Sequence, residues 1–318
     1  MTGAPVHGAP SRLPFDLPRL GIGTAPLGGL FEEVSEQDAA ATLEAAARAG
    51  LTYFDTAPRY GHGQAEERLG RLLAPAGITE PVISTKTGWL LRPAPDGSPG
   101  TVVTDWTEHG IRTSLESSLT RLRRSSVDVL YLHDPDDYVD EVRRTAYPAI
   151  RRLRDEGLVR AIGFGMNHSE KLAALVAEFE VDVVLIAGRF SLLGHEALTT
   201  LLPLCAKTGT AVVVGGVFNT GLLADPSDDA MFNYHPVPAE ELARAQRCRA
   251  LCAEFDVPLA AAAVQFPYLH PAVTSVVMGC RSADEVTANA AASRFPIPDE
   301  LWLRLAEEGF VPPQLLAG

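Results

Sequence analysis

Short apolar runs alternate with amphipathic stretches along most of the chain, and this rhythm restricts the fold more than any other feature. Eight runs rich in β-branched residues are expected to be strands: Leu20–Thr24, Thr52–Asp55, Val82–Lys86, Val127–His133, Val159–Gly163, Val181–Ala187, Ala211–Val214 and Thr274–Met278. Helical patterns accompany them, among them Glu36–Ala49, Glu66–Leu73, Glu108–Leu122, Arg144–Glu156, Ser169–Phe179, Glu196–Thr208, Ala239–Phe255 and Ser282–Ala292. Strands that alternate with helices are typical of a parallel sheet.

Eight such repeats favour a closed (β/α)8 barrel, a TIM barrel of the α/β class, over a doubly wound sheet, which usually stops at five or six strands. The length of 318 residues suits one such domain with long strand-end loops. No Gly-x-Gly-x-x-Gly motif follows the first strand, so a Rossmann unit is not expected. We expect the barrel to span residues 18–318 and a flexible tail rich in Pro, Gly and Ala to span residues 1–17.

Composition excludes several other classes of protein. The formal net charge of −13 argues against a nucleic-acid partner, because such proteins concentrate Lys and Arg. The chain has four cysteines, which we expect to be buried thiols rather than disulfides or zinc ligands: Cys205, Cys248, Cys252 and Cys280. Without a secretory leader pattern or an apolar run of about 20 residues, the sequence predicts a soluble cytoplasmic protein that does not bind membranes.

Four polar residues stand at or just after the ends of predicted strands: Asp55, Tyr60, Lys86 and His133. The carboxyl ends of barrel strands open onto one face, so these side chains are expected to converge there. Tyrosine is a poor acid or base at neutral pH, but a neighbouring ammonium stabilises its phenolate. We expect Lys86 to supply that charge, Asp55 to pair with Lys86, and His133 to orient a substrate oxygen. Taken singly, the four residues fit a turn cap, a packed ring, a solvated strand end and a loop histidine, and only their joint placement favours catalysis.

Two connections are long for a barrel, residues 87–106 and 218–238, and both are rich in Gly and Pro. They contain four aromatic residues that we expect to form a wall of the substrate pocket: Trp89, Trp106, Phe232 and Tyr234. The alternative is a pair of disordered insertions.

The segments around these residues are similar to those of a known family. Phe54-Asp-Thr-Ala-Pro-Arg-Tyr-Gly61, Glu66-Glu-Arg-Leu-Gly70, Ser84-Thr-Lys86 and Leu130-Tyr-Leu-His133 resemble the aldo-keto reductase superfamily, and the likeness spans roughly residues 17 to 310. The resemblance implies a (β/α)8 barrel that binds an extended nicotinamide dinucleotide. It also implies that Tyr60 is the acid/base, that Lys86 and Asp55 tune it, and that His133 orients the substrate.

The resemblance further implies a set of cofactor contacts: Asn167, Gly216, Phe218, Leu222, Gly279, Arg281, Ser282, Glu285 and Asn289. Three positions depart from the family pattern: Met166 replaces a serine, Ala187 replaces a glutamine, and Gly215 or Gly216 replaces the tyrosine that stacks on nicotinamide. Phe218 is the candidate substitute for that ring. Glu285 stands where members that prefer NADP commonly carry a basic residue, so the expected cofactor is NAD, with NADP possible through Arg281.

Further runs narrow the resemblance to one branch of the superfamily. His133-Asp-Pro-Asp-Asp137 and Gly215-Gly-Val-Phe-Asn-Thr-Gly-Leu-Leu223 are similar to the branch of L-fucose, D-threo-aldose and L-galactose dehydrogenases and pyridoxal 4-dehydrogenase. These enzymes oxidise a cyclic hemiacetal to a lactone, so the resemblance implies a small sugar or pyridoxal as substrate. Two alternatives stay open: a broad NADPH-dependent carbonyl reductase, and a regulatory subunit that keeps the barrel and its cofactor.

Overall fold

Eight parallel strands form a closed barrel in the computed structural model, which describes residues 11–317 except 31, 93–99 and 234. The barrel strands are β1 (Leu20–Gly23), β2 (Tyr53–Asp55), β3 (Val82–Thr87), β6 (Val127–His133), β7 (Val159–Met166), β8 (Val183–Ala187), β9 (Ala211–Gly215) and β12 (Val273–Gly279). They follow one another around the barrel in chain order, and β12 closes it by pairing with β1. The single (β/α)8 domain that the sequence predicts is therefore confirmed.

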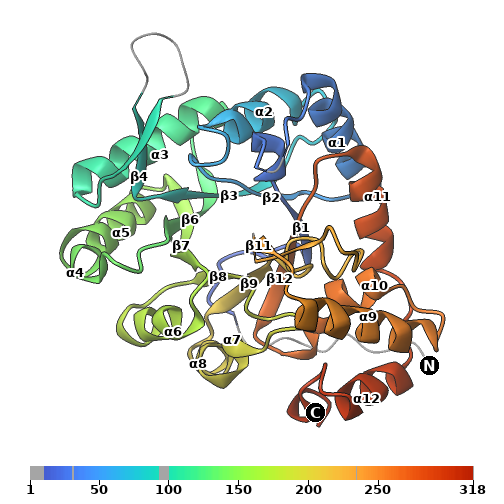
Figure 1. Ribbon diagram of the computed structural model, residues 1–318. Coiled ribbons are helices and arrows are strands. Elements are labelled where there is room, and N and C mark those ends of the chain that lie inside the picture. Colours follow the sequence, from blue (N-terminus) through green and yellow to red (C-terminus); the bar gives the residue numbers. More distant parts are fainter. Residues whose placement is uncertain (1–10, 31, 93–99, 234, 318) are drawn as a thin grey trace.

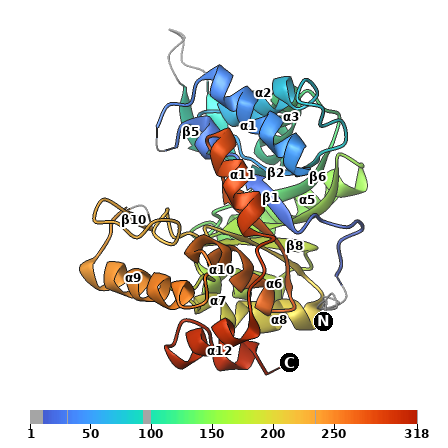
Figure 2. The same cartoon turned by 90° about the vertical axis from the view of Figure 1, so that its right-hand side faces the viewer.

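Helices surround the strands, as Figure 1 shows. They are α1 (Glu36–Ala49), α2 (Gln64–Leu72), α3 (Glu108–Leu122), α4 (Val139–Glu141), α5 (Tyr147–Asp155), α6 (Ser169–Glu178), α7 (Glu196–Thr199), α8 (Leu201–Thr208), α9 (Ala239–Ala253), α10 (Leu259–Gln265), α11 (Ala283–Ala292) and α12 (Asp299–Glu307). The second view shows α12 and the C-terminus at the edge of the molecule, away from α1, α2 and α3 (Figure 2). Among the described helices, none is long and apolar enough to span a lipid bilayer.

The stretch Glu196–Thr208, which the sequence pattern presents as one helix, is two helices that meet at Thr200. Thr200 has a φ of −133°, outside the helical range. Pro203 follows three residues later, and in a continuous helix its ring would collide with the carbonyl of Thr199. The break therefore follows from the proline.

Two apolar cores hold the barrel together. Residues that point inward from the strands, such as Val129, Leu185 and Val213, fill its interior, while a larger cluster packs between the strands and the helices. The N-terminal segment closes the interior at the end where the strands begin. There Leu17 is buried, and Leu13 and Phe15 pack beside it.

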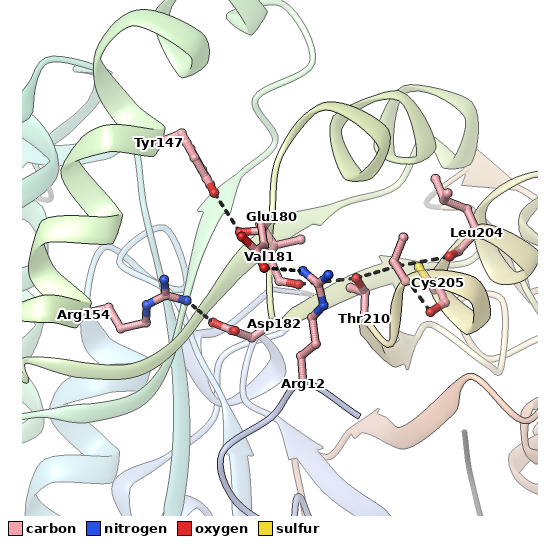
Figure 3. Close-up of polar contacts among 10 residues, drawn as sticks. Arg12, Tyr147, Arg154, Glu180, Val181, Asp182, Leu204, Cys205 and Thr210 are labelled. Atoms are coloured by element: carbon pink, nitrogen blue, oxygen red, sulfur yellow. Dashed lines mark hydrogen bonds and ion pairs between the residues drawn. The ribbon is translucent and has the colours of Figure 1, made fainter. Parts of the chain in front are cut away.

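Polar contacts fix the same end of the barrel (Figure 3). Arg12 forms an ion pair with Glu180 at 3.0 Å, and Arg154 forms one with Asp182 at 2.9 Å. Tyr147 donates a hydrogen bond to the carbonyl of Glu180, and Thr210 donates one to the carbonyl of Val181. These contacts tie the α6–β8 connection to three other parts of the chain, at the end opposite the predicted site.

Both long connections contain an antiparallel hairpin. The first is β4 (Trp89–Arg92) with β5 (Thr101–Thr104), and the second is β10 (Met231–Phe232) with β11 (His235–Pro236). The hairpins extend from the ends of β3 and β9, so they stand at the C-terminal face of the barrel, where TIM-barrel enzymes place their active sites.

Candidate active site

A buried ion pair lies at the C-terminal face of the barrel. The ammonium of Lys86, at the end of β3, is 2.7 Å from Oδ2 of Asp55, the last residue of β2. It also donates a hydrogen bond to the carbonyl of Thr56 at 2.8 Å. Burial lowers the pKa of Lys86, but Asp55 and Tyr60 outweigh burial and raise it to about 12. The ammonium is therefore charged throughout the neutral range.

A serine of the neighbouring strand β3 fixes the Asp55 carboxylate. Ser84, paired with Asp55 in the register of β2 and β3, donates a hydrogen bond from Oγ to Oδ1 at 2.7 Å. The Tyr53 hydroxyl lies 3.1 Å from the same Oγ. Because the single proton of Ser84 is directed at Asp55, Tyr53 acts as the donor in this contact. Thr24 in turn donates to the carbonyl of Asp55 at 3.0 Å.

Tyr60 and His133 face each other above this pair. Their rings meet edge to face, with centroids 6.0 Å apart, and the Lys86 ammonium lies 4.7 Å from the Tyr60 ring centroid. Asp55, Tyr60, Lys86 and His133, which the sequence places at separate strand ends, thus come together in one cluster.

Burial lowers the pKa of His133 well below its usual value, and the positive charges of Lys86 and Arg59 lower it further. The imidazole is therefore neutral at pH 7. Its Nδ1 is buried without a hydrogen-bond partner among the described residues, whereas Nε2 faces the Asp134 carboxylate at 3.7 Å. We assign the proton to Nε2, since that nitrogen faces an acceptor.

Close backbone packing positions the loop that carries Tyr60. A Cβ placed on Gly28 would lie 2.6 Å from the carbonyl carbon of Tyr60. A Cβ on Gly61, whose φ is +61°, would collide with the Gly28 carbonyl oxygen. Glycine at both positions therefore lets the loop after β1 support the Tyr60 backbone directly.

Arg59, Trp89 and Asp134 form the rim beside Tyr60 and His133. Arg59 pairs with Asp134 at 3.2 Å, and its guanidinium lies 4.2 Å from the Trp89 ring centroid. Trp89 donates a hydrogen bond from its indole nitrogen to the His133 carbonyl at 2.7 Å. The hairpin β4–β5 is thereby tied to the strand that carries His133.

The other aromatic residues predicted for the pocket wall have different surroundings. Trp106 is buried, lies beneath Gly88, and stacks on Tyr138 with ring centroids 5.1 Å apart. Phe232 is half-buried on β10, and Tyr234 lies outside the described residues. A role in binding substrate stays a prediction for all three.

The loop after β9 turns sharply and buries a polar side chain. Gly216, Asn219, Thr220 and Gly221 have φ values of 66°, 47°, 62° and 99°. Two backbone N–H groups of this turn are used inside it, since Asn219 donates to the Gly216 carbonyl and Gly221 to the Phe218 carbonyl. The Asn219 side chain is 2% exposed, and within the described part of the chain its Oδ1 has no hydrogen-bond partner. A nicotinamide dinucleotide fits such a loop because its carboxamide and ribose hydroxyl groups can donate a hydrogen bond to this buried oxygen.

The remaining predicted cofactor residues occupy the same arc of the barrel. Asn167 follows β7, and its carbonyl accepts a hydrogen bond from Arg189. Phe218 is half-buried and Leu222 is fully buried in the loop after β9. Gly279 ends β12, Ser282 caps α11 by accepting from the Glu285 N–H, and Asn289 donates to the Cys280 sulfur.

Arg281 is held between two carboxylates at the start of α11. Its backbone N–H and its Nε each donate to Glu285 at 2.9 Å, and Nη1 lies 3.0 Å from Glu32 on the β1–α1 connection. These three side chains, Glu32, Arg281 and Glu285, are here called the acidic clasp. The clasp carries one positive and two negative charges.

Asn219, Ser84, Arg59 and Asp134 were not identified as functional candidates from the sequence. A Pro after Asp134 and an Asn-Thr-Gly sequence at 219–221 signal tight turns, and those signals indicate where the backbone is unusual.

A barrel with a buried Lys–Asp pair, a tyrosine and a histidine at its C-terminal face defines a class of oxidoreductase, and comparison with known proteins identifies the family. The Aldo/keto reductase family model matches residues 19–307, so the chain belongs to that family, as its motifs predict. Members of the family use nicotinamide cofactors, and the protein is an oxidoreductase of this kind.

Two curated relatives show how the chain compares within the family. D-threo-aldose 1-dehydrogenase of Pseudomonas sp is 42% identical over 93% of this chain and 95% of the relative. Pyridoxal 4-dehydrogenase of Microbacterium luteolum is 38% identical over 92% and 94%. Among solved structures, an aldo-keto reductase of Bacillus halodurans in its holo form covers 95% of this chain and 96% of its own, with a TM-score of 0.74 at 24% identity.

Proposed function

We propose that this protein oxidises the hemiacetal carbon of an aldose to a lactone with NAD, and that Tyr60, Lys86, Asp55 and His133 are its catalytic residues. The observation that carries the proposal is the placement of the Lys86 ammonium between the Asp55 carboxylate, at 2.7 Å, and the Tyr60 ring, at 4.7 Å from its centroid. A permanent positive charge at this position stabilises the phenolate that an oxidation requires.

The chain's own groups handle the proton in this reaction. The phenolate oxygen of Tyr60 takes the proton of the anomeric hydroxyl, and the electron pair of that O–H bond forms the π bond of the lactone carbonyl. The C1–H bond breaks as the carbonyl forms, and a bound nicotinamide would accept the hydride. His133, neutral and with its proton on Nε2, donates a hydrogen bond to the same oxygen and fixes its orientation. Lys86 keeps its charge throughout.

The relatives support an aldose or a related hemiacetal as substrate. D-threo-aldose and pyridoxal appear in the names of the relatives at 42% and 38% identity, and both compounds form cyclic hemiacetals. A hemiacetal carries the acidic hydroxyl and the transferable hydrogen on one carbon, so Tyr60 can act without ring opening. Pyridoxal is the second candidate substrate, supported by the relative from Microbacterium luteolum.

Product identity tests the reaction. Purified protein is incubated with NAD and L-fucose, D-arabinose, L-galactose or pyridoxal, NADH is followed by absorbance, and the product is trapped with hydroxylamine, which converts lactones to hydroxamates. We expect NADH and a hydroxamate in equal amounts with at least one substrate. Rapid NADPH consumption on open-chain aldehydes, without lactone from any hemiacetal, would instead establish a carbonyl reductase.

Tyr60→Phe tests the acid/base role. The variant keeps the ring but loses the hydroxyl, so we expect unchanged NAD affinity and a fall in kcat/KM of at least about a hundredfold, the lower end for loss of a general base. Kinetics with the best substrate and NAD titration by fluorescence measure the two quantities. Near wild-type turnover in the variant would remove Tyr60 from the mechanism.

The acidic clasp supports a preference for NAD over NADP. A 2′-phosphate needs a free cation, whereas Arg281 is already bound by Glu285 and Glu32. Their excess negative charge repels a phosphate, but carboxylates can accept hydrogen bonds from ribose hydroxyls.

Glu285→Gln is expected to move the preference toward NADP. It removes one negative charge and weakens the hold on the Arg281 Nε, while Glu32 still contacts Nη1. The ratio of kcat/KM for NADP to that for NAD should therefore rise about tenfold, the size of one charge-assisted hydrogen bond. Asp284→Asn is the matched control, since it removes the same charge from an exposed neighbouring position on α11. Equal ratios in wild type and Glu285→Gln would show that the clasp does not face the adenosine ribose.

A further inference from the structure

Asp134 places a carboxylate immediately beside the predicted catalytic imidazole. Its Oδ2 is 3.7 Å from Nε2 of His133, too far for a direct hydrogen bond. The backbone of Asp134 has a φ of +47°, a conformation that Asp tolerates better than most residues, and its N–H donates to the Gly165 carbonyl at 2.9 Å. The carboxylate is thus held at a fixed point next to the site of the reacting oxygen.

Arg59 contacts the same oxygen of this carboxylate. Its Nη1 is 3.2 Å from Asp134 Oδ2, and its guanidinium stacks over Trp89, whose indole nitrogen is bonded to the His133 carbonyl. The side chains of Arg59 and Asp134 are 39% and 36% exposed, so a ligand at the mouth of the barrel can reach both. The loop carrying Tyr60 and the strand carrying His133 therefore each present one charged group at the rim.

The chemistry of this pair matches a hydroxyl group. A carboxylate only accepts hydrogen bonds and a guanidinium only donates them, whereas a hydroxyl does both. The reacting oxygen of the proposed substrate gives its proton to Tyr60 and accepts from His133, so it has no proton for Asp134. The next donor along an aldose ring is the hydroxyl on the carbon adjacent to the hemiacetal carbon.

We propose that Asp134 and Arg59 bind the hydroxyl adjacent to the hemiacetal carbon and thereby select aldoses with a free 2-hydroxyl over 2-deoxy sugars and over pyridoxal. The proposal rests on the proposed function and names its substrate class. Pyridoxal carries a phenolic oxygen near its hemiacetal carbon that is ionised near neutral pH. An anionic oxygen can accept from Arg59, but it offers Asp134 no proton and repels its carboxylate, so it engages only half of the pair.

The test compares substrates that differ at one position. D-arabinose and its 2-deoxy counterpart, and L-fucose and 2-deoxy-L-fucose, are assayed with NAD for lactone formation in wild type, Asp134→Ala, Asp134→Asn and Arg59→Gln. Asp137→Asn is the matched control, because Asp137 lies in the same loop with a side chain that is 86% exposed.

For wild type, we expect the 2-hydroxy sugar to be preferred at least about tenfold in kcat/KM, as for loss of one hydrogen bond to a charged group. In the Asp134 variants and in Arg59→Gln, kcat/KM should fall for the 2-hydroxy sugar and change little for the 2-deoxy sugar. The ratio of the two kcat/KM values should therefore approach one. In Asp134→Asn, kcat/KM for pyridoxal should rise relative to kcat/KM for the sugars. Asp137→Asn should keep the wild-type preference.

Two results would overturn the proposal. The first is lactone formation by wild type without discrimination at the 2-position. The second is an equal loss on both sugars in the folded variants, which would make Asp134 a support for His133 alone. Either result leaves the proposed function standing, because lactone is still formed, whereas the absence of lactone from every hemiacetal would refute the proposed function itself. Arg59→Gln keeps the test decisive if the Asp134 variants do not fold.

Discussion

At the scale of single residues, Asp55 is the most constrained side chain of the site. It binds the Lys86 ammonium through Oδ2 and the Ser84 hydroxyl through Oδ1, and Tyr53 lies behind Ser84. Burial raises the pKa of Tyr53, so this tyrosine remains a neutral hydrogen-bond donor. A carboxylate fixed at both oxygens holds its cation in one position, which suits a residue whose task is to keep a charge beside Tyr60.

Ser84→Ala is expected to weaken catalysis through the position of Asp55. Loss of the hydrogen bond lets the carboxylate rotate and loosens Lys86, so the Tyr60 phenolate is less stabilised. We expect kcat/KM to fall about tenfold at pH 7 and its pH profile to move to higher pH, because more alkaline conditions are then needed to deprotonate Tyr60. Ser275→Ala, a buried serine of β12 bonded to the Pro18 carbonyl, is the control. A loss of thermal stability with an unmoved pH profile would assign Ser84 a structural role only.

At the scale of elements, the loop after β1 supports the loop after β2. The 3-10 helix η1 (Pro26–Gly28) ends against the backbone at Tyr60 and Gly61, so two βα connections pack without any side chain between them. The position of Tyr60 is thus set by the path of both loops.

Gly28→Ala should displace Tyr60 more than it destabilises the fold. The added methyl would lie 2.6 Å from the Tyr60 carbonyl carbon, so the loop must move. We expect kcat/KM to fall by one to two orders of magnitude, because small displacements of a catalytic group are costly. Gly50→Ala is the comparison: it is strained by a φ of +72° at the end of α1 but meets nothing within 4 Å, so it should lower Tm and leave kcat/KM unchanged. Wild-type turnover in Gly28→Ala would show that the loop contact does not position Tyr60.

The sequence predicted the elements better than the loops that complete the site. Asp55, Lys86 and His133 end apolar runs, so strand periodicity alone places them on one face. Arg59 and Asp134 lie in turns, and their pairing depends on a positive φ and on where two loops meet, neither of which periodicity determines. Trp106 shows a related limit, since an aromatic residue in a loop can face the substrate or pack inward, and here it lies under Gly88.

At the scale of the whole molecule, the contacts of the N-terminal segment and the proposed catalytic cluster lie at opposite ends of the barrel. The N-terminal segment fills the end where the strands begin, with Leu17 packed on the interior core and Arg12 paired with Glu180. The proposed catalytic cluster lies where the strands end. A substitution at the end where the strands begin can therefore change stability without changing activity.

Leu17→Ala is expected to lower stability and leave activity unchanged. Leu17 is 7% exposed, and removing a buried leucine side chain costs about 2–5 kcal/mol of unfolding free energy. Thermal unfolding should therefore begin at a lower temperature, while kcat/KM at 25 °C stays at the wild-type value. Leu303→Ala, with the side chain 57% exposed on α12, should change neither quantity. A large loss of activity in folded Leu17→Ala would mean that the two ends are coupled.

The order of the strands places the two sets of proposed functional residues in different halves of the chain. Asp55, Tyr60, Lys86 and His133, together with Arg59 and Asp134, all come from β2, β3 and β6 and the loops that follow them, whereas Asn219 and Arg281 follow β9 and β12. Under the proposed function, recombination within the β7 region is therefore expected to exchange the proposed cofactor residues between relatives as a block and to leave the proposed substrate residues intact. Glu32, which reaches Arg281 from the loop after β1, is the one partner of the acidic clasp that such a chimera would have to bring along.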